Sequence, residues 1–217
     1  MSEDSDWAQL TEARLLDAAL GHVEQLGWTS RLVAAAARDV GLSVAEAELL
    51  LPEGPRDLAA LLARRHDVSA LAALDAVDAA DLKIRERIRA GVLARVEAAM
   101  GDAHATRRWM GFLVLPANAA LGLRLLWASA DGLWRWAGDT ATDENHYTKR
   151  VLLAEILATT LAIRLVGGAK AAESHLDGRI AAVMAFERWK GSLGPAGVAH
   201  RLAGALGKLR YGGLAAR

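Results

Sequence analysis

The residues able to carry out acid–base, nucleophilic or metal chemistry are few and poorly spaced. The chain has 217 residues, six of them histidine and none cysteine, which excludes disulfides, thiolate catalysis and cysteine-ligated metal centres. The histidines form no H-x3-H, H-E-x-x-H or E-x-x-H pair, as zinc hydrolases and diiron proteins require. Asp143 and His146 are three apart, but at a helix start where aspartate is expected as a cap.

No nucleophile elbow, Walker loop or dinucleotide-binding glycine motif is present. We therefore predict no catalytic residue, no metal and no cofactor. An enzyme acting on apolar substrates remains a weaker alternative.

The elements that must position any site are helices. Hydrophobic residues make up 53% of the chain, prolines number four, and apolar residues recur three and four apart, so we predict an all-α fold. In residues 117–137 the charges are Arg124, Asp131 and Arg135 alone, and such a narrow polar stripe predicts a helix buried on most sides. Thr140 and Asp143 have the spacing of a capping box before the next helix. The predicted helices cover about 7–26, 31–39, 44–51, 55–73, 81–100, 104–115, 117–137, 152–166 and 169–189.

The first three helices have the spacing of a helix-turn-helix, with a turn at residues 41–43, and resemble the start of a TetR-type repressor. Residues 1–66 hold eleven acids and six bases, a net charge of −5, although the whole chain has a net charge of zero. The helix that would enter the DNA groove carries Glu46 and Glu48 and no base, and DNA phosphates repel acids. We predict no nucleic-acid binding. A ligand-responsive TetR-type regulator is the alternative function.

Large apolar side chains and glycines are concentrated between residues 109 and 157. This composition is typical of a helical core, and also of a helical fold that encloses an apolar cavity. The candidate lipid-binding residues are Trp109, Phe112, Leu113, Leu121, Leu125, Leu126, Trp127, Leu152 and Ile156.

The segment 134–150 closely resembles the signature of the Coq-nine family of ubiquinone-biosynthesis accessory proteins, W-x-x-AGD-x-(S/T)TD-x-N-x-YT-(K/R)-R, and the resemblance extends over about residues 12–190. It implies a TetR-like fold that does not bind DNA. It also implies a non-enzymatic protein that binds isoprenoid lipids, including ubiquinone precursors, and presents them to the diiron demethoxyubiquinone hydroxylase. The matching positions are Trp134, Ala137, Gly138, Asp139, Thr142, Asp143, Asn145, Tyr147, Thr148, Lys149 and Arg150.

The surface around this signature carries the hydroxylase-docking patch of the family. One position departs from the pattern, because His146 stands where relatives commonly have Trp, so an apolar anchor is partly replaced by a polar, titratable ring. Taken one at a time, the signature residues are better explained as caps, packing residues or solvated charges, and the joint match at eleven positions is what favours the functional interpretation. The resemblance implies docking by Asp131, Leu133, Trp134, Asp143, Asn145, His146 and Tyr147.

The end of the chain, from Arg188 onward, holds six bases and no acid. Its leucines and valine fall on one side of a helical wheel beside basic residues, which is typical of an interfacial amphipathic helix. A helix that folds back on the domain or on a second copy is the alternative. The family also has a membrane-binding helix there. The candidate membrane-binding residues are Val198, Arg201, Leu202, Leu206, Lys208 and Leu209.

These patterns predict three regions: helix-turn-helix-like helices in 1–73, a lipid-binding helical core in 74–190, and a linker with a basic amphipathic helix in 191–217. The acidic amino terminus is unlike a signal peptide, and the longest uncharged run, between Arg108 and Arg124, is too short to span a membrane. We expect a soluble intracellular protein, peripherally associated with the inner, cytoplasmic membrane. By analogy with TetR-type proteins we expect a homodimer.

Overall fold

The computed structural model describes residues 3–139 and 144–192, and within these ranges the chain is helical with no strand. The all-α prediction is confirmed. The last two predicted helices are parts of a single element, α8, in which Gly168 has non-helical dihedrals (φ 81°, ψ −178°). The helices are α1 (Glu3–Leu26), α2 (Ser30–Val40), α3 (Val44–Leu50), α4 (Pro55–Leu74), α5 (Ile84–Met100), α6 (Ala103–Leu113), α7 (Ala119–Trp136) and α8 (Glu144–Ser192).

Local capping residues explain where the first helices stop and start. Gly41 ends α2 in the left-handed conformation, with φ 79°, which glycine adopts without steric cost. Ser43 begins α3 with a capping box, since its Oγ accepts from the Glu46 N–H at 3.3 Å and Glu46 Oε2 accepts from the Ser43 N–H at 2.8 Å. The side-chain and backbone hydrogen bonds from Ser43 lower the pKa of Glu46, so this acid is ionised on the helix that would face DNA.

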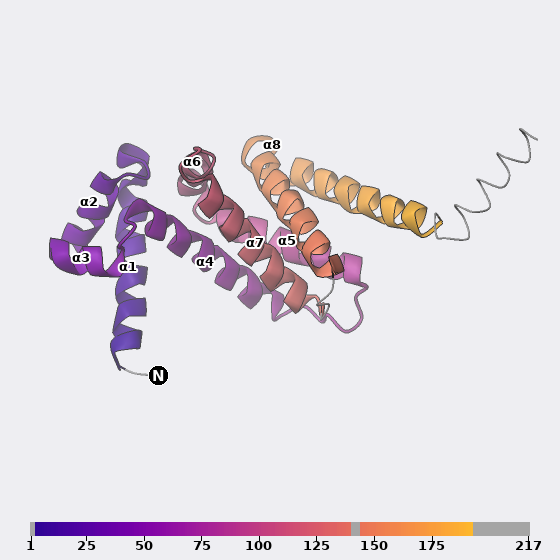
Figure 1. Cartoon of the computed structure of the whole chain (residues 1–217), viewed down its shortest axis with the longest axis horizontal. Coiled ribbons are helices and arrows are strands. Elements are labelled where there is room, and N and C mark those ends of the chain that lie inside the picture. The colour runs from indigo at the N-terminus through magenta and orange to yellow at the C-terminus, as the bar shows by residue number, and fades with distance from the viewer. Residues whose placement is uncertain (1–2, 140–143, 193–217) are drawn as a thin grey trace, which may run out of the picture. The chain divides into compact units, whose positions relative to one another are not determined.

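The chain forms two compact units, residues 1–176 and 177–217. In the first unit, α1, α2 and α3 lie together, and the long α4 leads from them to the helices that follow (Figure 1). Helix α1 packs against α2, α4 and α6, and α4 packs against α5 and α7. The largest buried apolar side chains of this unit belong to α1, α2, α4, α7 and α8. They include Leu15, Leu32, Leu58, Leu62, Leu74, Leu121, Leu153 and Leu176.

The first part of α8 lies against α5 and against the residues that follow its own break. Arg164 donates from Nε and Nη2 to both carboxylate oxygens of Glu97 on α5, at 2.8 and 3.2 Å. Beyond Gly168 the chain turns back, so that His175 Nε2 lies 3.0 Å from Thr159 Oγ1. The positive φ of Gly168 permits this reversal within one helical element.

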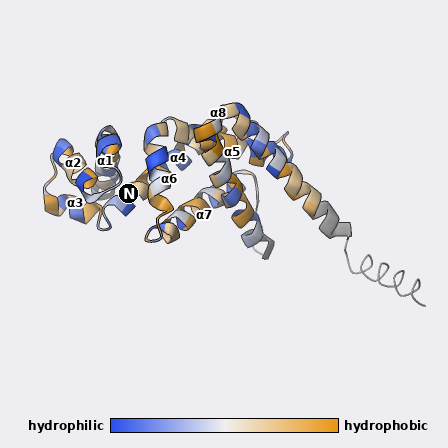
Figure 2. Ribbon diagram, turned by 90° about the horizontal axis from the view of Figure 1, so that it is seen from above, coloured by the Kyte–Doolittle hydropathy of each residue, from blue (hydrophilic) through white to orange (hydrophobic). Residues whose placement is uncertain are grey.

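Helix α7 is buried along one face only, so the prediction that it is buried on most sides is wrong. It packs against α4, α5 and α6, but Leu123 is 70% exposed and Trp127 is half-buried. Figure 2 shows hydrophobic residues recurring along α7. Part of the apolar surface of α7 is therefore not covered by the other described helices. The buried positions are Leu121, Gly122, Ser129, Ala130 and Leu133.

One described helix, Tyr147–Phe186 within α8, is long and apolar enough by length and composition to cross a membrane, contrary to the expectation from uncharged runs. The sequence test missed it because Glu155 and Arg164 interrupt the apolar residues. Core helices also meet this criterion, and α8 buries a regular face that includes Leu153, Leu157 and Leu161. In the most apolar window of this helix, 28% is buried inside the described structure.

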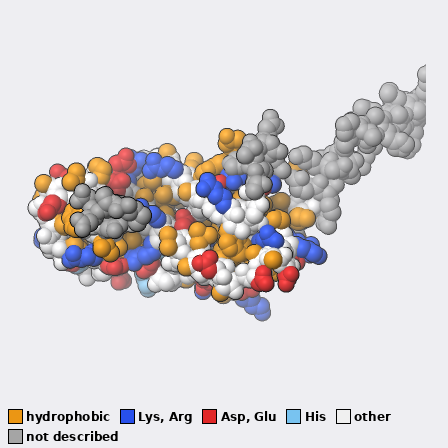
Figure 3. Space-filling view, turned by 90° about the horizontal axis from the view of Figure 1, so that it is seen from below, with side chains coloured by type: hydrophobic (Ala, Val, Ile, Leu, Met, Phe, Trp, Pro, Cys, Tyr) orange, Lys and Arg blue, Asp and Glu red, His pale blue; other side chains and the backbone are white. Residues whose placement is uncertain are grey.

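Acidic and basic side chains are interspersed on the face of the molecule that Figure 3 shows, with hydrophobic side chains gathered between them. This distribution agrees with the net charge of zero. A nucleic-acid interface requires a continuous basic surface, and this face does not provide one.

Candidate functional site

The signature residues converge on an ionic cluster that joins the end of α7 to the start of α8. Arg150, whose side chain is only 2% exposed, donates from Nε to Asp131 Oδ1 at 2.5 Å and from Nη1 to Asp139 Oδ2 at 3.2 Å. Lys149 Nζ lies 2.7 Å from Asp139 Oδ1, and Arg135 Nη2 lies 2.5 Å from Asp131 Oδ2. Each carboxylate thus meets two cations, which a buried charge requires.

The charge state of Asp139 follows from two opposing effects. Burial raises the pKa of its carboxyl, whereas hydrogen bonds from Lys149 and Arg150 and the charges of these residues lower it; the pKa ends below its ordinary value. The carboxylate is therefore ionised at neutral pH and holds the two cations of α8.

A glycine ends α7 in the geometry that the cluster needs. Gly138 has φ 89°, and the Asp139 N–H after it donates back to the Trp134 carbonyl at 3.0 Å. Arg87, on α5, donates from Nη1 to the carbonyl of Ala137 at 3.1 Å. A Cβ on Gly138 would lie 3.2 Å from that nitrogen, so glycine is favoured here by both the backbone conformation and the close approach of Arg87.

Trp134 provides a second tie between the two helices. Its Nε1 donates to the carbonyl of Lys149 at 3.1 Å, and the Lys149 ammonium lies 5.4 Å from its ring centroid, within the range of a cation–π interaction. The signature therefore encodes mainly a rigid α7–α8 junction.

An exposed apolar surface runs beside this junction; we call it the α7–α8 stripe and define it as Leu123, Trp127, Tyr147 and Val151. Each helix contributes a pair of residues four apart, which lie on one face. The rings of Trp127 and Tyr147 join the two pairs, with centroids 5.9 Å apart. Leu123, Tyr147 and Val151 are 70%, 63% and 57% exposed. An apolar surface of this kind is typical of an interaction site.

The structure separates the predicted docking residues. Tyr147 is exposed in the stripe, Trp134 is half-buried, and Asp131 is bound within the ionic cluster with its side chain 17% exposed. The placement of Leu133 on a docking surface is wrong: it is 3% exposed, and its Cδ2 would lie 3.2 Å from a Cβ on Gly91. It fills a close approach between α7 and α5.

Several predicted residues lie outside what the structure describes. Asp143 and the proposed cap with Thr140 fall in the undescribed segment 140–143, and the side chains of Asn145 and His146 are also not described. The membrane-binding candidates of the carboxyl-terminal tail, Val198, Arg201, Leu202, Leu206, Lys208 and Leu209, lie beyond the last described residue.

The sequence reasoning did not group Leu123 and Val151 with the docking residues. Their spacing could have identified them as part of the same surface, because each lies four residues from an aromatic member of the stripe on its own helix. The exposed face of α7 could not be predicted in this way, because its buried face is equally apolar and composition does not tell which face other helices cover.

The predicted lipid-binding residues divide between core and surface. Trp109 donates from Nε1 to the Ala59 carbonyl at 2.9 Å and is 4% exposed, and Phe112 packs against Trp28 with ring centroids 6.4 Å apart. Leu113, Leu121 and Ile156 are also buried. The half-buried members are Phe112, Leu125, Leu126, Trp127 and Leu152.

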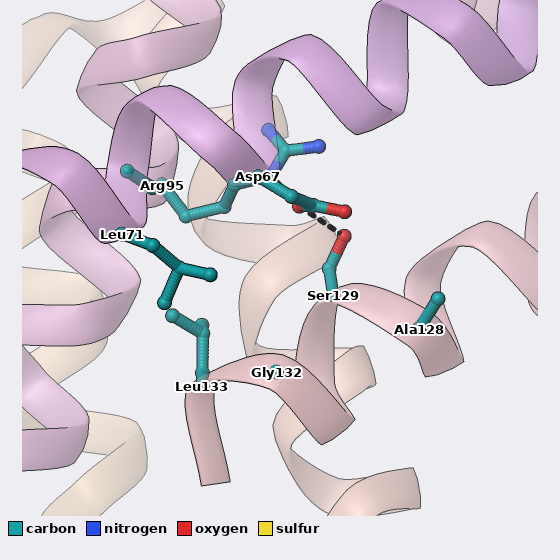
Figure 4. A pocket seen from close by; sticks show the side chains of 8 residues that line it. Asp67, Leu71, Arg95, Ala128, Ser129, Gly132 and Leu133 are labelled. Carbon is teal, nitrogen blue, oxygen red and sulfur yellow. Dashed lines mark hydrogen bonds and ion pairs between the residues drawn. The ribbon is translucent and has the colours of Figure 1, made fainter. Parts of the chain in front are cut away.

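Three hollows among the described residues lie away from the predicted lipid site. One of about 340 Å³ lies beside α2 and α3, and one of about 410 Å³ lies between α1 and α4. The third, between α4, α5 and α7, measures about 20 Å³ and holds no more than one water-sized group. Ser129 Oγ donates to Asp67 Oδ1 beside it at 2.7 Å, and Arg95 Nε donates to the same oxygen at 2.5 Å (Figure 4).

The described residues include no group of three or more potential metal ligands. His66 is 1% exposed, and its pKa is lowered to about 3 by burial first and then by the charges of Arg95 and Arg65. Its imidazole is neutral at physiological pH, and neither ring nitrogen has a hydrogen-bond partner. A weak base sealed in the core does not form a general-base site.

Comparison with known proteins finds one family model and several curated proteins that are similar to the part of the chain holding the signature. The COQ9 family model matches residues 119–187. Similar curated proteins include the ubiquinone biosynthesis protein COQ9, mitochondrial, of Rattus norvegicus, 30% identical over 164 residues that make up 73% of this chain and 53% of the relative. The Homo sapiens protein of that name is 30% identical over 169 residues, 73% of this chain and 52% of the relative.

A further relative, the ubiquinone biosynthesis protein COQ9-B, mitochondrial, of Xenopus laevis, is 28% identical over 175 residues, covering 76% of this chain and 58% of its own length. The chain thus spans about half the length of the curated relatives it matches.

Proposed function

We propose that the chain is a member of the COQ9 family, whose model matches residues 119–187, and that it acts in ubiquinone biosynthesis as a lipid-binding accessory protein. It binds isoprenoid quinone precursors and presents them to the demethoxyubiquinone hydroxylase at a membrane. The chain itself performs no covalent step and carries no cofactor; its ligand is an isoprenoid or a phospholipid.

The observation that carries this proposal is the α7–α8 stripe. Its aromatic pair joins the half-buried Trp127 of α7 to the exposed Tyr147, which is itself a signature position. Aromatic residues on a rigid support are typical anchors of protein interfaces. The buried Arg150 cluster provides that support, because it fixes the end of α7 against the start of α8.

Docking is tested with Tyr147→Lys, which places a charge on the exposed centre of the stripe. The matched control is Val166→Lys, at another exposed position of α8, 91% exposed. We expect the first variant to weaken association with purified hydroxylase at least tenfold, the loss of roughly 1.4 kcal/mol that a modest anchor contributes, and the control to bind as the wild type does. Equal affinities of both variants would contradict docking at the stripe.

Lipid binding is tested by mass spectrometry of organic extracts of the purified full chain. The half-buried apolar side chains of α7 and α8, Leu125, Leu126, Trp127 and Leu152, support the proposal, because they leave hydrophobic area that an isoprenoid can contact. We expect a co-purified isoprenoid or phospholipid, and uptake of an added quinone precursor. Absence of both would contradict lipid binding. Tyr147→Lys serves as a control here, since a surface substitution leaves the lipid content unchanged.

Peripheral membrane association and a homodimer complete the proposal. The basic tail is attracted to anionic lipid by its charge, and deletion of residues 195–217 is expected to lower sedimentation with anionic vesicles while folding is retained. Unchanged sedimentation would remove the tail from the proposal. The homodimer is tested by light scattering of the purified chain.

No observation favours a TetR-type regulator. Helix α3 exposes Val44, Glu46, Glu48 and Leu49, a surface of apolar and acidic groups with no base to contact phosphate.

A further inference from the structure

The turn between α6 and α7 exposes an apolar surface, which we call the α6–α7 corner and define as residues 114–120. Val114 is 75% exposed and Leu115 51%. Asn118, the one polar side chain in this range, is turned inward, 7% exposed, and its Nδ2 donates to the Phe112 carbonyl at 3.1 Å. The remaining exposed side chains are Pro116, Ala117, Ala119 and Ala120.

Part of the backbone of this corner is hydrogen-bonded within the chain. The Val114 N–H donates to the Met110 carbonyl at 3.1 Å, and the Asn118 N–H donates to the Leu115 carbonyl at 2.8 Å. Pro116 has no N–H to satisfy. A segment that leaves water loses less when its polar backbone groups are paired within the chain, and these bonds pair two of the donors of the turn.

The charged residues that flank the corner in the sequence are all positive. Between Asp102 and Asp131 the sequence contains no acid, and exposed arginines stand on both sides of the turn, Arg108 on α6 and Arg124 on α7. An apolar tip between arginines is complementary to anionic lipid, whose headgroups attract the cations while the acyl region accepts the tip. A convex turn of small aliphatic residues lacks the large aromatic anchors on which protein interfaces depend.

We propose that the α6–α7 corner is a membrane-contact element of the folded domain, which inserts Val114 and Leu115 into an anionic lipid surface with Arg108 and Arg124 at the headgroups. This contact is separate from the basic tail. It goes beyond the proposed function, because its test requires neither a bound isoprenoid nor the hydroxylase.

The absence of cysteine from the chain permits a local test in the full-length protein. Val114→Cys is labelled with an environment-sensitive fluorophore, and the control is Leu49→Cys, equally exposed at 78% but on α3. On vesicles of phosphatidylcholine with phosphatidylglycerol, we expect a blue shift at position 114, and its quenching by lipids that carry a quencher in the acyl region. Position 49 should show neither. An unshifted probe at 114 on vesicles that bind the chain would overturn the proposal.

The arginines are tested by vesicle partitioning. Arg108→Gln and Arg124→Gln should each lower partitioning into the anionic vesicles about fivefold, as expected for one cation near the surface, with little effect on vesicles of phosphatidylcholine alone. Arg31→Gln, at an exposed position of α2, is the control, and equal losses for it would contradict the proposal. A corner that instead joins two copies would be revealed by a lower mass of Val114→Glu in light scattering without lipid, and this outcome would also overturn it.

Discussion

Substitution of Arg150 by glutamine tests whether the ionic cluster holds the α7–α8 junction. The Arg150 side chain is 2% exposed and pairs with both Asp131 and Asp139, so Arg150→Gln leaves two carboxylates with less compensation in a largely buried site. Removing one partner of a buried ion pair costs about 3–5 kcal/mol. Because Arg135 and Lys149 still contact the two carboxylates, we expect the lower end of this range, about 3 kcal/mol.

The assay is urea unfolding at neutral pH, followed by circular dichroism. With a slope of about 2 kcal/mol per molar, a loss of about 3 kcal/mol lowers the midpoint by roughly 1.5 M. The matched control is Arg135→Gln, which removes a bridge to the same Asp131 from a side chain that is 74% exposed. An exposed pair contributes at most about 1 kcal/mol. If Arg150→Gln destabilised the chain no more than this control, the assignment of the cluster as the junction's main support would be refuted.

The same cluster predicts an acid dependence of stability. The folded-state pKa of Asp139 lies below its ordinary value, so its contribution to stability is complete above the unfolded pKa, near 3.9, and is lost as the pH falls through the folded value. The difference in unfolding free energy between the wild type and Asp139→Asn should therefore be largest near neutral pH and shrink below about pH 4. A difference independent of pH would show that Asp139 stabilises the chain through shape, not charge.

Other substitutions test the junction and the core by chemical denaturation. Gly138→Ala should cost about 1–2 kcal/mol, because φ is 89° and Arg87 is close, whereas Gly132→Ala, within α7 and with open space at its Cβ, should stabilise by about 0.5–1 kcal/mol; equal effects would remove the backbone argument. His66→Leu should make the unfolding free energy fall less steeply with decreasing pH below about pH 6.5. The reason is that the native imidazole, with a pKa of about 3, stays neutral while the unfolded one binds a proton, at about 1.4 kcal/mol per pH unit; an unchanged slope would contradict this. Trp109→Phe should cost about 0.5–1.5 kcal/mol, because the buried side chain loses its hydrogen bond to the Ala59 carbonyl, and a neutral effect would contradict this.

The helices were predictable because their determinants are local. Gly41, Ser43 and Pro55 mark helix ends by backbone conformation, side-chain capping and fixed φ, and the periodicity of apolar residues gives the helices between them. The separation of α8 into two parts also followed from the sequence, although the break is a single glycine, Gly168, within a continuous element.

The candidate site was less predictable because it depends on long-range contacts. Nothing in the local sequence distinguishes Arg150, which follows Lys149 near the start of a helix, from an exposed base. Its burial depends on Asp131 of α7 and Asp139 of the turn after α7, which pair with it in the folded chain. The burial of Leu133 likewise depends on the close approach of Gly91 on α5. Periodicity identifies an apolar face but does not tell which neighbour covers it, which is why α7 was expected to be buried on most sides.

The geometry of the junction indicates that most of the signature residues stabilise the fold, and that few of them are available to contact a partner. Arg150 and Asp139 meet within the chain, Lys149 binds Asp139, and Gly138 serves the backbone, so these matches are explained by the fold alone. Of the described side chains at matching positions, Tyr147 and Thr148 remain exposed, and neither is charged. A partner that reads this surface must therefore do so largely through apolar contact with the stripe. Its affinity should then depend weakly on salt, because screening weakens exposed charge pairs and leaves apolar burial largely unaffected.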